Sequence, residues 1–308
     1  MDIISIIVPT LNRPAALQRA LQSLARQVQP ADAQLEIVVV DNSTDRNARP
    51  LVETLNSAKN IHYVHEPVMG IASARNRGIA AAAGNWIAFL DDDEEAGEKW
   101  LVSLFQIANK TGADVVFGPV EAKSESAGGD LALMSYFSRA IDREDGADIT
   151  GLVAHLGTNN SMFHKSRCMS GNQTFDVDLN ATGGEDSLLL KGLAQNGRRF
   201  AWSSDARVTE WVPPRRMTWN YVRQRKFLSG QIRVIVLHKL QPANWGRIGF
   251  WMMVGLAQSI AGMSGMILLR PFNRARSERA AVISCAGLGK LFWTPRFRAK
   301  LYGSGLVS

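Results

Sequence analysis

Short apolar runs alternate with helix-like segments through the first 118 residues of the chain. The runs occupy residues 3–8, 35–40, 61–65, 86–90 and 114–118. The first two are continuously apolar and rich in β-branched residues, which is typical of strands buried on both faces of a sheet. Pro14 is a suitable first residue for a helix, and Leu17, Leu21 and Leu24 follow at helical spacings of four and three. This alternation predicts βαβ units, and therefore an α/β fold with a parallel sheet covered by helices.

The composition excludes several other classes of protein. Of the 308 residues 46% are hydrophobic and 20% are charged, so the chain can form a large core and is not disordered. A mean hydropathy of -0.08 excludes a membrane protein with many spans. Cys168 and Cys285 lie far apart, which excludes a zinc ribbon or a disulfide scaffold and fits a reducing compartment. The N-terminal apolar run follows no basic segment and ends at Pro9, so we expect no secretory signal.

Charge is divided unevenly along the chain. Residues 1–206 hold 18 Lys and Arg against 26 Asp and Glu, a net charge of −8. Residues 207–308 hold 17 Lys and Arg against only Glu210 and Glu278, a net charge of +15. An acidic body with a basic C-terminal region predicts an anionic partner for that region, such as nucleic acid, a phosphorylated ligand or an anionic membrane surface.

Polar and turn-forming residues stand at the carboxyl ends of three of the expected strands. They are Pro9, Thr10, Asn12 and Arg13 after the first, Asp41 at the end of the second, and Asp91, Asp92 and Asp93 after the fourth. Parallel sheets bind ligands beyond this edge, so we expect these residues to converge on one rim. The sequence has no GxGxxG after the first strand and no GxxxxGK[ST], which disfavours dinucleotide binding and a P-loop ATPase.

The acidic run after the fourth strand suits a divalent cation. In an extended segment Asp91 and Asp93 point to one side and Asp92 to the other. One side can hold a metal ion through oxygen ligands while the other binds a ribose hydroxyl. The alternative is an acidic first turn that complements a helix dipole, which is the role we expect for Glu94, Glu95 and Glu98. Three like charges directly after a buried strand favour the metal.

Asp41, Arg75 and Arg77 each have a ligand role and a simpler alternative. Asp41 ends a hydrophobic strand, where its carboxylate suits a nucleobase N–H, although alone it would more simply begin an Asx-turn. Because the other clusters share its rim, we favour the ligand role. Arg75 and Arg77 can clamp a diphosphate through charge-assisted bonds or form the solvated face of a helix. We favour the diphosphate for Arg75 and leave both roles open for Arg77.

Residues 182–188, TGGEDSL, place a glycine pair before two carboxylates and an apolar helix. Glycine lets the backbone approach a ligand closely, and a carboxylate at a helix start can act as a general base. The alternative is helix N-capping by Asp186.

The segments IIVPTLNRP, VVVDNSTD, ARNRGI, FLDDDE and GGEDSLLL occur in this order over about residues 3–230. Together they resemble glycosyltransferase family 2, which has the GT-A nucleotide-sugar-binding fold, a Rossmann-like mixed or parallel sheet flanked by helices. Residues 210–230 resemble the C-terminal part of bacterial exopolysaccharide glucosyltransferases of the succinoglycan type. The resemblance implies inverting transfer of a sugar from a nucleotide donor, usually UDP-linked, to an acceptor hydroxyl. The metal-binding histidine that the family often places after the base is absent, and whether Glu210 replaces it stays open.

The resemblance implies roles for the residues above. The nucleotide-sugar would be bound by Pro9, Thr10, Asn12, Arg13, Asp41, Arg75, Asp91 and Asp92. Mg²⁺ or Mn²⁺ would be held by Asp93 with Asp91 and would bridge the diphosphate. Asp186 would deprotonate the acceptor, with Glu185 as the second candidate.

Fewer residues are expected on the acceptor side. Residues 155–164, HLGTNNSMFH, resemble the family strand that lines the acceptor, so Asn159 or Asn160 would contact a sugar, although an ordinary hairpin strand is an equal alternative. Gly184 and Arg225 are the other acceptor candidates.

Residues 248–269 form an uncharged segment of 22 residues. As a helix it would be ~33 Å long, near the thickness of the hydrocarbon core of a bilayer. A single crossing would export the four arginines of residues 270–279, against the positive-inside tendency. A re-entrant or in-plane pair with a second helix at residues 280–293 keeps them at the cytoplasmic surface. We expect peripheral or monotopic attachment to the cytoplasmic side of the cell membrane, with two ordinary core helices as the alternative.

We expect a catalytic domain over residues 1–230, with a nucleotide-sugar half at about 1–118 and an acceptor half at about 119–230. A helical, basic, membrane-associating region would follow at residues 231–308. The resemblance implies a metal-dependent hexosyltransferase in polysaccharide or glycan biosynthesis, acting on a saccharide acceptor in lipid-linked form. The alternatives are a sugar nucleotidyltransferase and a non-enzymatic basic module that binds membranes or nucleic acid. The basic region has no nucleic-acid-binding motif, so we expect no nucleic-acid partner.

Overall fold

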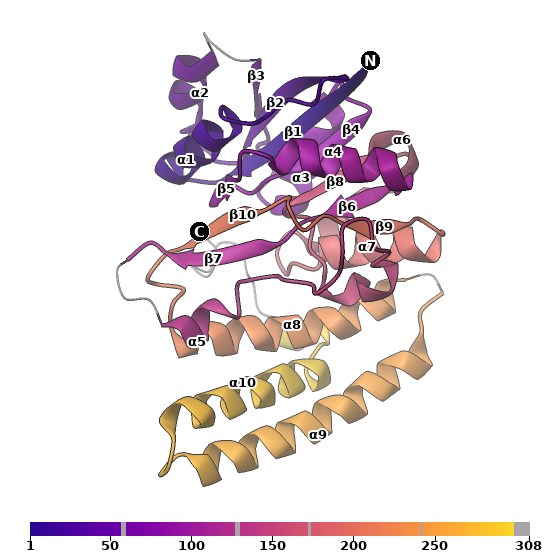
Figure 1. Cartoon of the computed structure of the whole chain (residues 1–308). Coiled ribbons are helices and arrows are strands. Elements are labelled where there is room, and N and C mark those ends of the chain that lie inside the picture. Colours follow the sequence, from indigo (N-terminus) through magenta and orange to yellow (C-terminus); the bar gives the residue numbers. More distant parts are fainter. Residues whose placement is uncertain (57–59, 127–129, 172–173, 241, 299–308) are drawn as a thin grey trace. The chain divides into compact units, whose positions relative to one another are not determined.

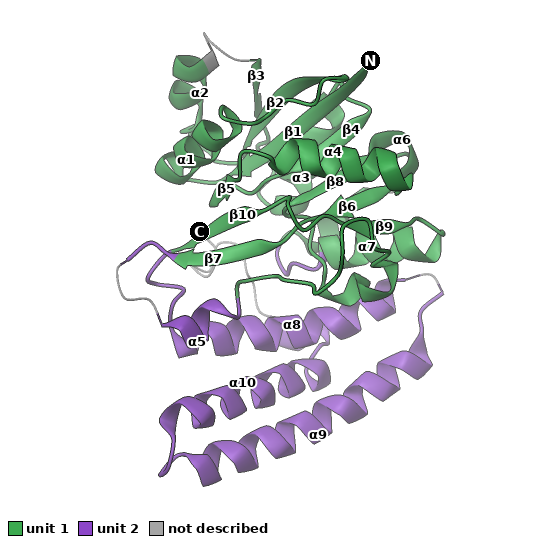
Figure 2. Cartoon of the chain, in the orientation of Figure 1, with its two compact units in different colours: residues 1–123, 137–180, 185–212 green, residues 124–136, 181–184, 213–308 purple. Residues whose placement is uncertain are grey.

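The computed structural model describes the chain except for residues 57–59, 127–129, 172–173, 241 and 299–308. The chain forms two compact units (Figure 2). The sheet unit comprises residues 1–123, 137–180 and 185–212, and the helical unit comprises residues 124–136, 181–184 and 213–308. The expected domain boundary at residues 230–231 falls inside one helix, so the helical unit takes in more of the chain than the sequence indicated.

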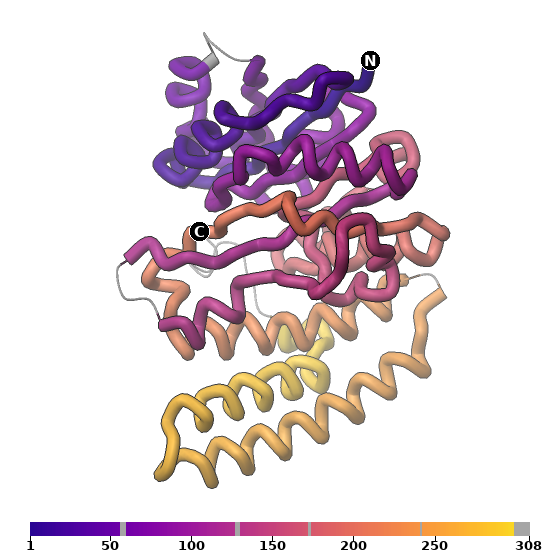
Figure 3. Tube along the Cα trace, in the orientation of Figure 1, coloured from indigo at the N-terminus to yellow at the C-terminus, as the bar shows by residue number. Residues whose placement is uncertain are grey.

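The sheet unit is built on a seven-stranded sheet with the order β3-β2-β1-β4-β8-β6-β9 (Figure 1). Its strands are β1 (Asp2–Thr10), β2 (Ala33–Asp41), β3 (Ile61–His65), β4 (Trp86–Phe89), β6 (Val115–Phe117), β8 (Ser161–His164) and β9 (Phe200–Trp202). All five expected runs form strands, which confirms the α/β class. β8 is antiparallel to β4 and β6, whereas the other neighbours in this sheet are parallel. The sheet is mixed because a segment from much later in the chain is inserted beside β4 (Figure 3).

A second, three-stranded sheet has the order β5-β10-β7. Its strands are β5 (Glu94–Ala96), β10 (Val208–Val212) and β7 (Val120–Ser124). The helix-dipole role expected for Glu94 and Glu95 is wrong, because both lie in β5, and the next helix, α4 (Trp100–Thr111), has no acidic residue in its first turn. Glu210 of β10 pairs in register with Glu94, so this small sheet brings a late carboxylate beside the acidic run.

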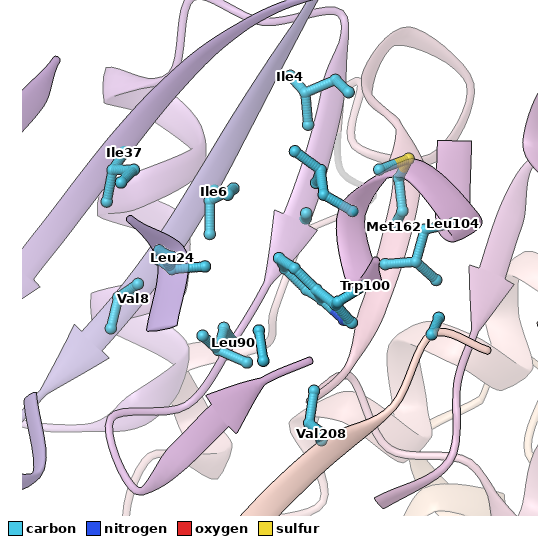
Figure 4. Packing of buried hydrophobic residues seen from close by; sticks show 14 of the residues in the cluster. Ile4, Ile6, Val8, Leu24, Ile37, Leu90, Trp100, Leu104, Met162 and Val208 are labelled. Atoms are coloured by element: carbon cyan, nitrogen blue, oxygen red, sulfur yellow. The ribbon is translucent and has the colours of Figure 1, made fainter. Parts of the chain in front are cut away.

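Helices pack against both faces of the seven-stranded sheet. Besides α4 they are α1 (Pro14–Leu24), α2 (Arg49–Asn56), α3 (Ile71–Ala81), α6 (Lys165–Cys168) and α7 (Glu185–Gln195), with the 3₁₀ turns η1 (Thr150–His155) and η2 (Val177–Leu179). In β1, Ile4 and Ile6 join a hydrophobic core with α1 and α4 (Figure 4). Ile7 joins a second core with α3 and α7. Alternate side chains of β1 thus enter opposite cores, which explains why the run is continuously apolar.

The helical unit is built mainly from three long helices. Its elements are α5 (Leu131–Met134), α8 (Trp219–Lys239), α9 (Trp245–Leu269), α10 (Arg274–Leu291) and η3 (Pro295–Phe297). α9 and α10 form an antiparallel pair (Figure 1). Their backbones approach closely, since a Cβ at Gly262 would lie 2.5 Å from the backbone nitrogen of Ser284. The two helices expected at residues 248–269 and 280–293 are therefore present as a pair.

α9 does not pack as an ordinary core helix. Among the described residues it is the one helix long and apolar enough to cross a membrane, and only 17% of its apolar stretch is buried. Phe250, Met253 and Ile260 are 61%, 67% and 55% exposed. The core-helix alternative is therefore wrong for α9, and its exposed surface fits a membrane-associating tail.

Candidate active site

The ends of β1 and β4 are joined by hydrogen bonds and ion pairs. Thr10 Oγ1 donates to Asp92 Oδ2 at 2.8 Å. Arg13 Nη1 donates to Asp92 Oδ1 at 3.1 Å and to Asp93 Oδ2 at 3.0 Å. β1 and β4 are adjacent parallel strands, so their carboxyl ends lie at the same edge of the sheet. The predicted convergence of these two polar clusters is confirmed.

Asp41 ends β2 in register with Thr10, one strand further along the same edge. It is fully buried. Its Oδ1 accepts from the backbone nitrogen and Oγ of Ser43 at 3.0 and 2.6 Å, and its Oδ2 accepts from the Ala48 nitrogen and the Tyr63 hydroxyl at 3.0 and 3.1 Å. These bonds form the Asx-turn that was the alternative role. A nucleobase would have to displace one of these donors, so that contact stays a prediction.

Pro9 and Asn12 flank the end of β1 in different surroundings. Pro9 is buried in the strand, whereas Asn12 is exposed and has a φ of 56°, in the left-handed region that asparagine tolerates. Its side-chain oxygen accepts from Asn47 Nδ2. Of the two, Asn12 has the side chain that a ligand can reach.

Arg75 of α3 connects the acidic run to the second pair of carboxylates. It is 5% exposed, and its Nη1 donates to Glu185 Oε1 at 3.0 Å while its Nη2 donates to Asp91 Oδ1 at 3.4 Å. Its guanidinium also lies 5.4 Å from the ring centre of Phe175. Arg77, two residues along the helix, is exposed, as the solvated-face alternative predicts. Arg75 is therefore the arginine of this segment that lies at the carboxylate cluster.

The glycine pair before Glu185 has a backbone that other residues rarely adopt. Gly183 and Gly184 have φ of 74° and 97°. α7 begins at Glu185, so Asp186 lies inside the first turn, and the N-capping alternative is wrong. Glu185 is 5% exposed, whereas Asp186 is only half-buried and accepts at Oδ1 from the Ser187 nitrogen at 2.6 Å. Asp186 is the more accessible carboxylate of the two.

Arg139 belongs to the same cluster, although no pattern in the sequence singled it out. Its Nη1 donates to the Gly157 carbonyl at 3.2 Å and to Asn159 Oδ1 at 3.1 Å, and its Nη2 donates to the Asn159 carbonyl at 2.7 Å. Asn159 Nδ2 in turn donates to Glu94 Oε1 at 2.7 Å. A Cβ at Gly157 would lie 3.2 Å from Asp186 Oδ2. Arg139 therefore fixes a loop that runs between the acidic segment and Asp186.

Carboxylates outnumber arginines in this cluster by seven to three. They are Asp91, Asp92, Asp93, Glu94, Glu185, Asp186 and Glu210, with Arg13, Arg75 and Arg139. Burial, and then the charge of Asp93, raises the pKa of Asp92 to about 7. Burial, and then the charge of Asp186, raises the pKa of Glu185 to about 7. Burial also raises the pKa of Asp91 and of Glu94. This excess of negative charge favours a bound cation.

The donor atoms fit a hard divalent cation such as Mg²⁺ or Mn²⁺. They are carboxylate oxygens, and Glu185 Oε2 is buried with no hydrogen-bond partner among the described residues. In the part of the chain that the structure describes, no group of three or more Asp, Glu, His or Cys side chains is placed so that it could hold a metal ion by itself. Mg²⁺ commonly takes one or two protein carboxylates and fills its shell with water and substrate phosphate. Glu210 lies in register with Glu94, and whether it replaces the missing histidine stays open.

The acceptor prediction for Asn160 is wrong. Its side chain is fully buried, with Oδ1 accepting from Trp100 Nε1 at 2.7 Å and Nδ2 donating to the carbonyls of Pro119 and Ala206 at 2.7 and 2.8 Å. A side chain with all its polar groups occupied in the interior holds loops together and cannot reach a sugar.

The other two acceptor candidates, Gly184 and Arg225, belong to the helical unit. A Cβ at Gly184 would lie 2.8 Å from Ile232 Cγ2, and Arg225 Nη1 donates to the Tyr136 carbonyl at 3.4 Å. These contacts explain why glycine and arginine stand there, and their roles toward an acceptor stay predictions.

Comparisons of sequence place the chain among known proteins. Residues 5–166 match the model of the family described as Glycosyl transferase family 2. The succinoglycan biosynthesis protein ExoM of Rhizobium meliloti (strain 1021) is 35% identical over 231 residues, which cover 74% of this chain and 73% of ExoM. A validoxylamine A glucosyltransferase of Streptomyces hygroscopicus subsp. limoneus is 36% identical over 121 residues, 38% of this chain and 26% of that protein.

Comparison of structures gives the same fold. The crystal structure of residues 1–349 of TarS from S. aureus matches with a TM-score of 0.57, covering 94% of this chain and 90% of that one at 19% identity. The same TarS fragment is known in complex with UDP, with a TM-score of 0.57, and with UDP-GlcNAc, with a TM-score of 0.56. The likeness confirms the expected GT-A fold.

Proposed function

Because the chain belongs to glycosyltransferase family 2, we propose that it transfers a hexose from a UDP-linked donor to a hydroxyl group of a saccharide acceptor in exopolysaccharide biosynthesis. The observation that carries this proposal is the continuous set of contacts from Thr10 and Arg13, through the acidic run, to Arg75 and Glu185. These contacts link the acidic run, which would act on the donor, to Glu185, and the next residue, Asp186, is a separate carboxylate of the kind that displacement at a sugar carbon needs. The similarity to ExoM, a succinoglycan biosynthesis protein, and to TarS, which is known in complex with UDP-GlcNAc, supports the same chemistry.

On the donor side, Thr10, Asn12 and Asp41 would hold the nucleoside, and the acidic run would bind the ribose. Arg75 would contact the diphosphate through charge-assisted hydrogen bonds. Mg²⁺ or Mn²⁺, held by Asp93 with Asp91, would supply positive charge to the diphosphate as it leaves.

On the acceptor side, Asp186 would be the general base. An acceptor hydroxyl is a poor nucleophile until a carboxylate takes its proton. The proton passes to Asp186, the hydroxyl oxygen bonds to the anomeric carbon, and the bond from that carbon to the diphosphate oxygen breaks. Direct displacement of this kind inverts the anomeric centre. Glu185 would keep Arg75 in place, because it is buried and paired with that guanidinium.

The acceptor would be lipid-linked and the chain would work at the cytoplasmic side of the cell membrane, peripherally or monotopically attached. The exposed apolar surface of α9 supports this location. Nucleotide-sugars are made in the cytosol, so the donor site would face that side.

A panel of donors tests the proposal. Incubation with UDP-, GDP- and dTDP-hexoses in the presence of Mn²⁺ should release UDP from the UDP-linked donors, and EDTA should abolish the release. Release of pyrophosphate from UTP and a sugar phosphate, with no nucleoside diphosphate from any donor, would instead identify a sugar nucleotidyltransferase.

A further inference from the structure

Three cations of the helical unit, Lys226 and Arg233 of α8 and Lys290 of α10, are half-buried or buried and have no acidic partner among the described residues. From residue 213 onward the sequence has 16 Lys and Arg against one acid, Glu278, whose carboxylate pairs with Arg223 at 3.0 Å. The three cations form no ion pair with any described residue; their contacts are with aromatic rings, an amide and a carbonyl. Half-buried and buried cations of this kind favour an anionic ligand.

Two of these cations meet on one side of α9. The Arg233 guanidinium lies 4.8 Å from the ring centre of Trp251. Lys290 Nζ donates to Gln258 Oε1 at 2.8 Å, and a Cβ at Gly255 would lie 2.8 Å from the Cβ of Lys290. Trp251, Gly255 and Gln258 follow one another at spacings of four and three, so they share one face of the helix.

Lys226, the third cation, affects Lys290 through its charge. Burial, and then the charges of Arg233 and Lys226, lowers the pKa of Lys290 to about 8. Lys226 Nζ lies 5.4 Å from the ring centre of Tyr136. Burial also lowers the pKa of Lys226. The three cations repel one another, and a bound phosphate would offset that repulsion.

A row of large apolar side chains, the apolar stripe, runs along the exposed side of α9. Its members are Phe250, Met253, Leu256, Ile260, Met263 and Ile267, each between 45% and 67% exposed. They follow one another at spacings of three and four, which places them on one face. The residues of α9 that are buried include Gly255, Ser259 and Gly262, which pack against α10.

We propose that the helical unit binds an anionic lipid bilayer, with the apolar stripe in the acyl region and Lys226, Arg233 and Lys290 on a lipid phosphate. The inference rests on the proposed membrane attachment and is independent of the sugar chemistry. A bilayer offers an apolar environment for the stripe and phosphates for the cations. A second copy of the chain would bring the same excess of positive charge to the contact, and nucleic acid would leave the stripe in water.

The helix pair lies in the plane of the membrane surface rather than across it. α10 is packed along α9 and carries Arg274, Arg276 and Arg279 as well as Lys290. A pair that crossed the bilayer would draw Lys290 and its partner Gln258 into the hydrocarbon, which is costly. In the plane, the stripe is immersed while the cations stay among the headgroups.

Flotation of the full chain with lipid vesicles tests the proposal without any sugar donor. Binding should be at least about tenfold tighter to phosphatidylcholine vesicles containing phosphatidylglycerol than to phosphatidylcholine alone. Combining Lys226→Gln, Arg233→Gln and Lys290→Gln should weaken binding to the anionic vesicles about a hundredfold, at about fivefold for each cation. The matched control combines Arg26→Gln, Arg77→Gln and Lys110→Gln, which removes the same charge from exposed positions of the sheet unit, and should weaken binding less than about tenfold.

A second pair of variants tests the stripe. Phe250→Ser with Ile260→Ser should weaken vesicle binding at least about tenfold, whereas Val28→Ser with Val177→Ser, which removes exposed apolar side chains from the sheet unit, should leave it unchanged. Circular dichroism melting checks that each variant folds.

Three outcomes would overturn the proposal: equal weakening by the two charge combinations, retention of the chain in membranes after alkaline carbonate extraction, or a dimer that does not float. The flotation assay contains no donor, so a failure to bind vesicles says nothing against glycosyl transfer. Transfer to a soluble acceptor is measured separately.

Discussion

Replacement of Arg75 by methionine tests whether this residue holds the carboxylate cluster together. The side chains of Arg75 and Glu185 are each 6% exposed, and the guanidinium also reaches Asp91. Removing one partner of a buried ion pair leaves an uncompensated charge, which costs about 3–5 kcal/mol. We expect Arg75→Met to lower the free energy of unfolding by this amount at pH 8.

The loss should depend on pH in a defined direction. The pKa of Glu185 is raised to about 7 in the folded protein, from an ordinary value of 4.5, so its contribution to stability is present below pH 4.5 and is lost as the pH rises through 7. Arg75 opposes that rise in pKa, so without it the pKa moves higher and more stability is lost at alkaline pH. At pH 5 Glu185 is protonated in both proteins, and we expect a loss of only about 1–2 kcal/mol.

Urea denaturation at pH 5 and pH 8 gives the two values. Arg77→Met, on the same helix but exposed, is the matched control and should change stability by less than about 0.5 kcal/mol at both pH values. The double variant Arg75→Met with Glu185→Met should recover at least about 1.5 kcal/mol of the loss at pH 8, because no unpaired Glu185 charge remains. Equal losses at the two pH values, or equal losses for Arg75→Met and Arg77→Met, would refute the reasoning.

Three further predictions concern the same unit. Since burial raises the pKa of Asp92 and of Glu185 to about 7, the free energy of unfolding should fall as the pH rises from about 4.5 to 7, and Glu185→Gln should make the fall shallower; a steeper fall in that variant would contradict the assignment. Arg139→Lys cannot reproduce the forked hydrogen bonds to Gly157 and Asn159. We therefore expect kcat for transfer to drop at least about tenfold while donor affinity stays within about twofold. A loss of donor affinity instead would place Arg139 on the donor side. Asn160→Ala removes the partner of Trp100 Nε1 and of the Ala206 carbonyl, whereas the Pro119 carbonyl keeps its bond from the Val208 nitrogen, so stability measured by urea denaturation should fall by about 2–4 kcal/mol. An unchanged stability with a raised acceptor KM would restore the acceptor role.

The rim of the sheet could be predicted because parallel strands all end at one edge. The residues that follow the first and fourth strands therefore had to lie at that edge. The pairing of β1 with β4, which the sequence did not specify, brings Thr10 to Asp92. The preference for Arg75 over Arg77 agrees with the structure. Residues two apart on a helix lie on different faces, and Arg75 is the one that contacts Asp91 and Glu185.

The remaining features depend on contacts between distant segments. β8 has four residues, and nothing in them specifies insertion between β4 and β6. Asn160 is held by Trp100 and by carbonyls of residues 119 and 206, so its burial depends on three segments that are distant in the sequence. Arg139 lies in a segment without periodicity, and its role appears only when residues 157–159 fold back on it.

The helical unit shows where local patterns were informative and where they were not. The uncharged segment at residues 248–269 predicted α9 by length and composition. The domain boundary was placed at residue 230, although α8 runs through it, because the family resemblance ended there while the helix did not. The basic residues of α8 could not be grouped with Lys290 until α8 and α10 were seen to pack on each other.

In the proposed mechanism the acidic run acts on the leaving diphosphate and Asp186 on the incoming hydroxyl. Titration of a UDP-hexose in the presence of Mn²⁺ is the direct test of this division. The proteins compared are the wild type, Asp93→Ala and Asp186→Ala, each shown to fold. We predict that Asp93→Ala weakens donor binding at least about tenfold and that Asp186→Ala binds as the wild type does while transferring no sugar. Loss of donor binding in Asp186→Ala together with normal binding in Asp93→Ala would contradict the account.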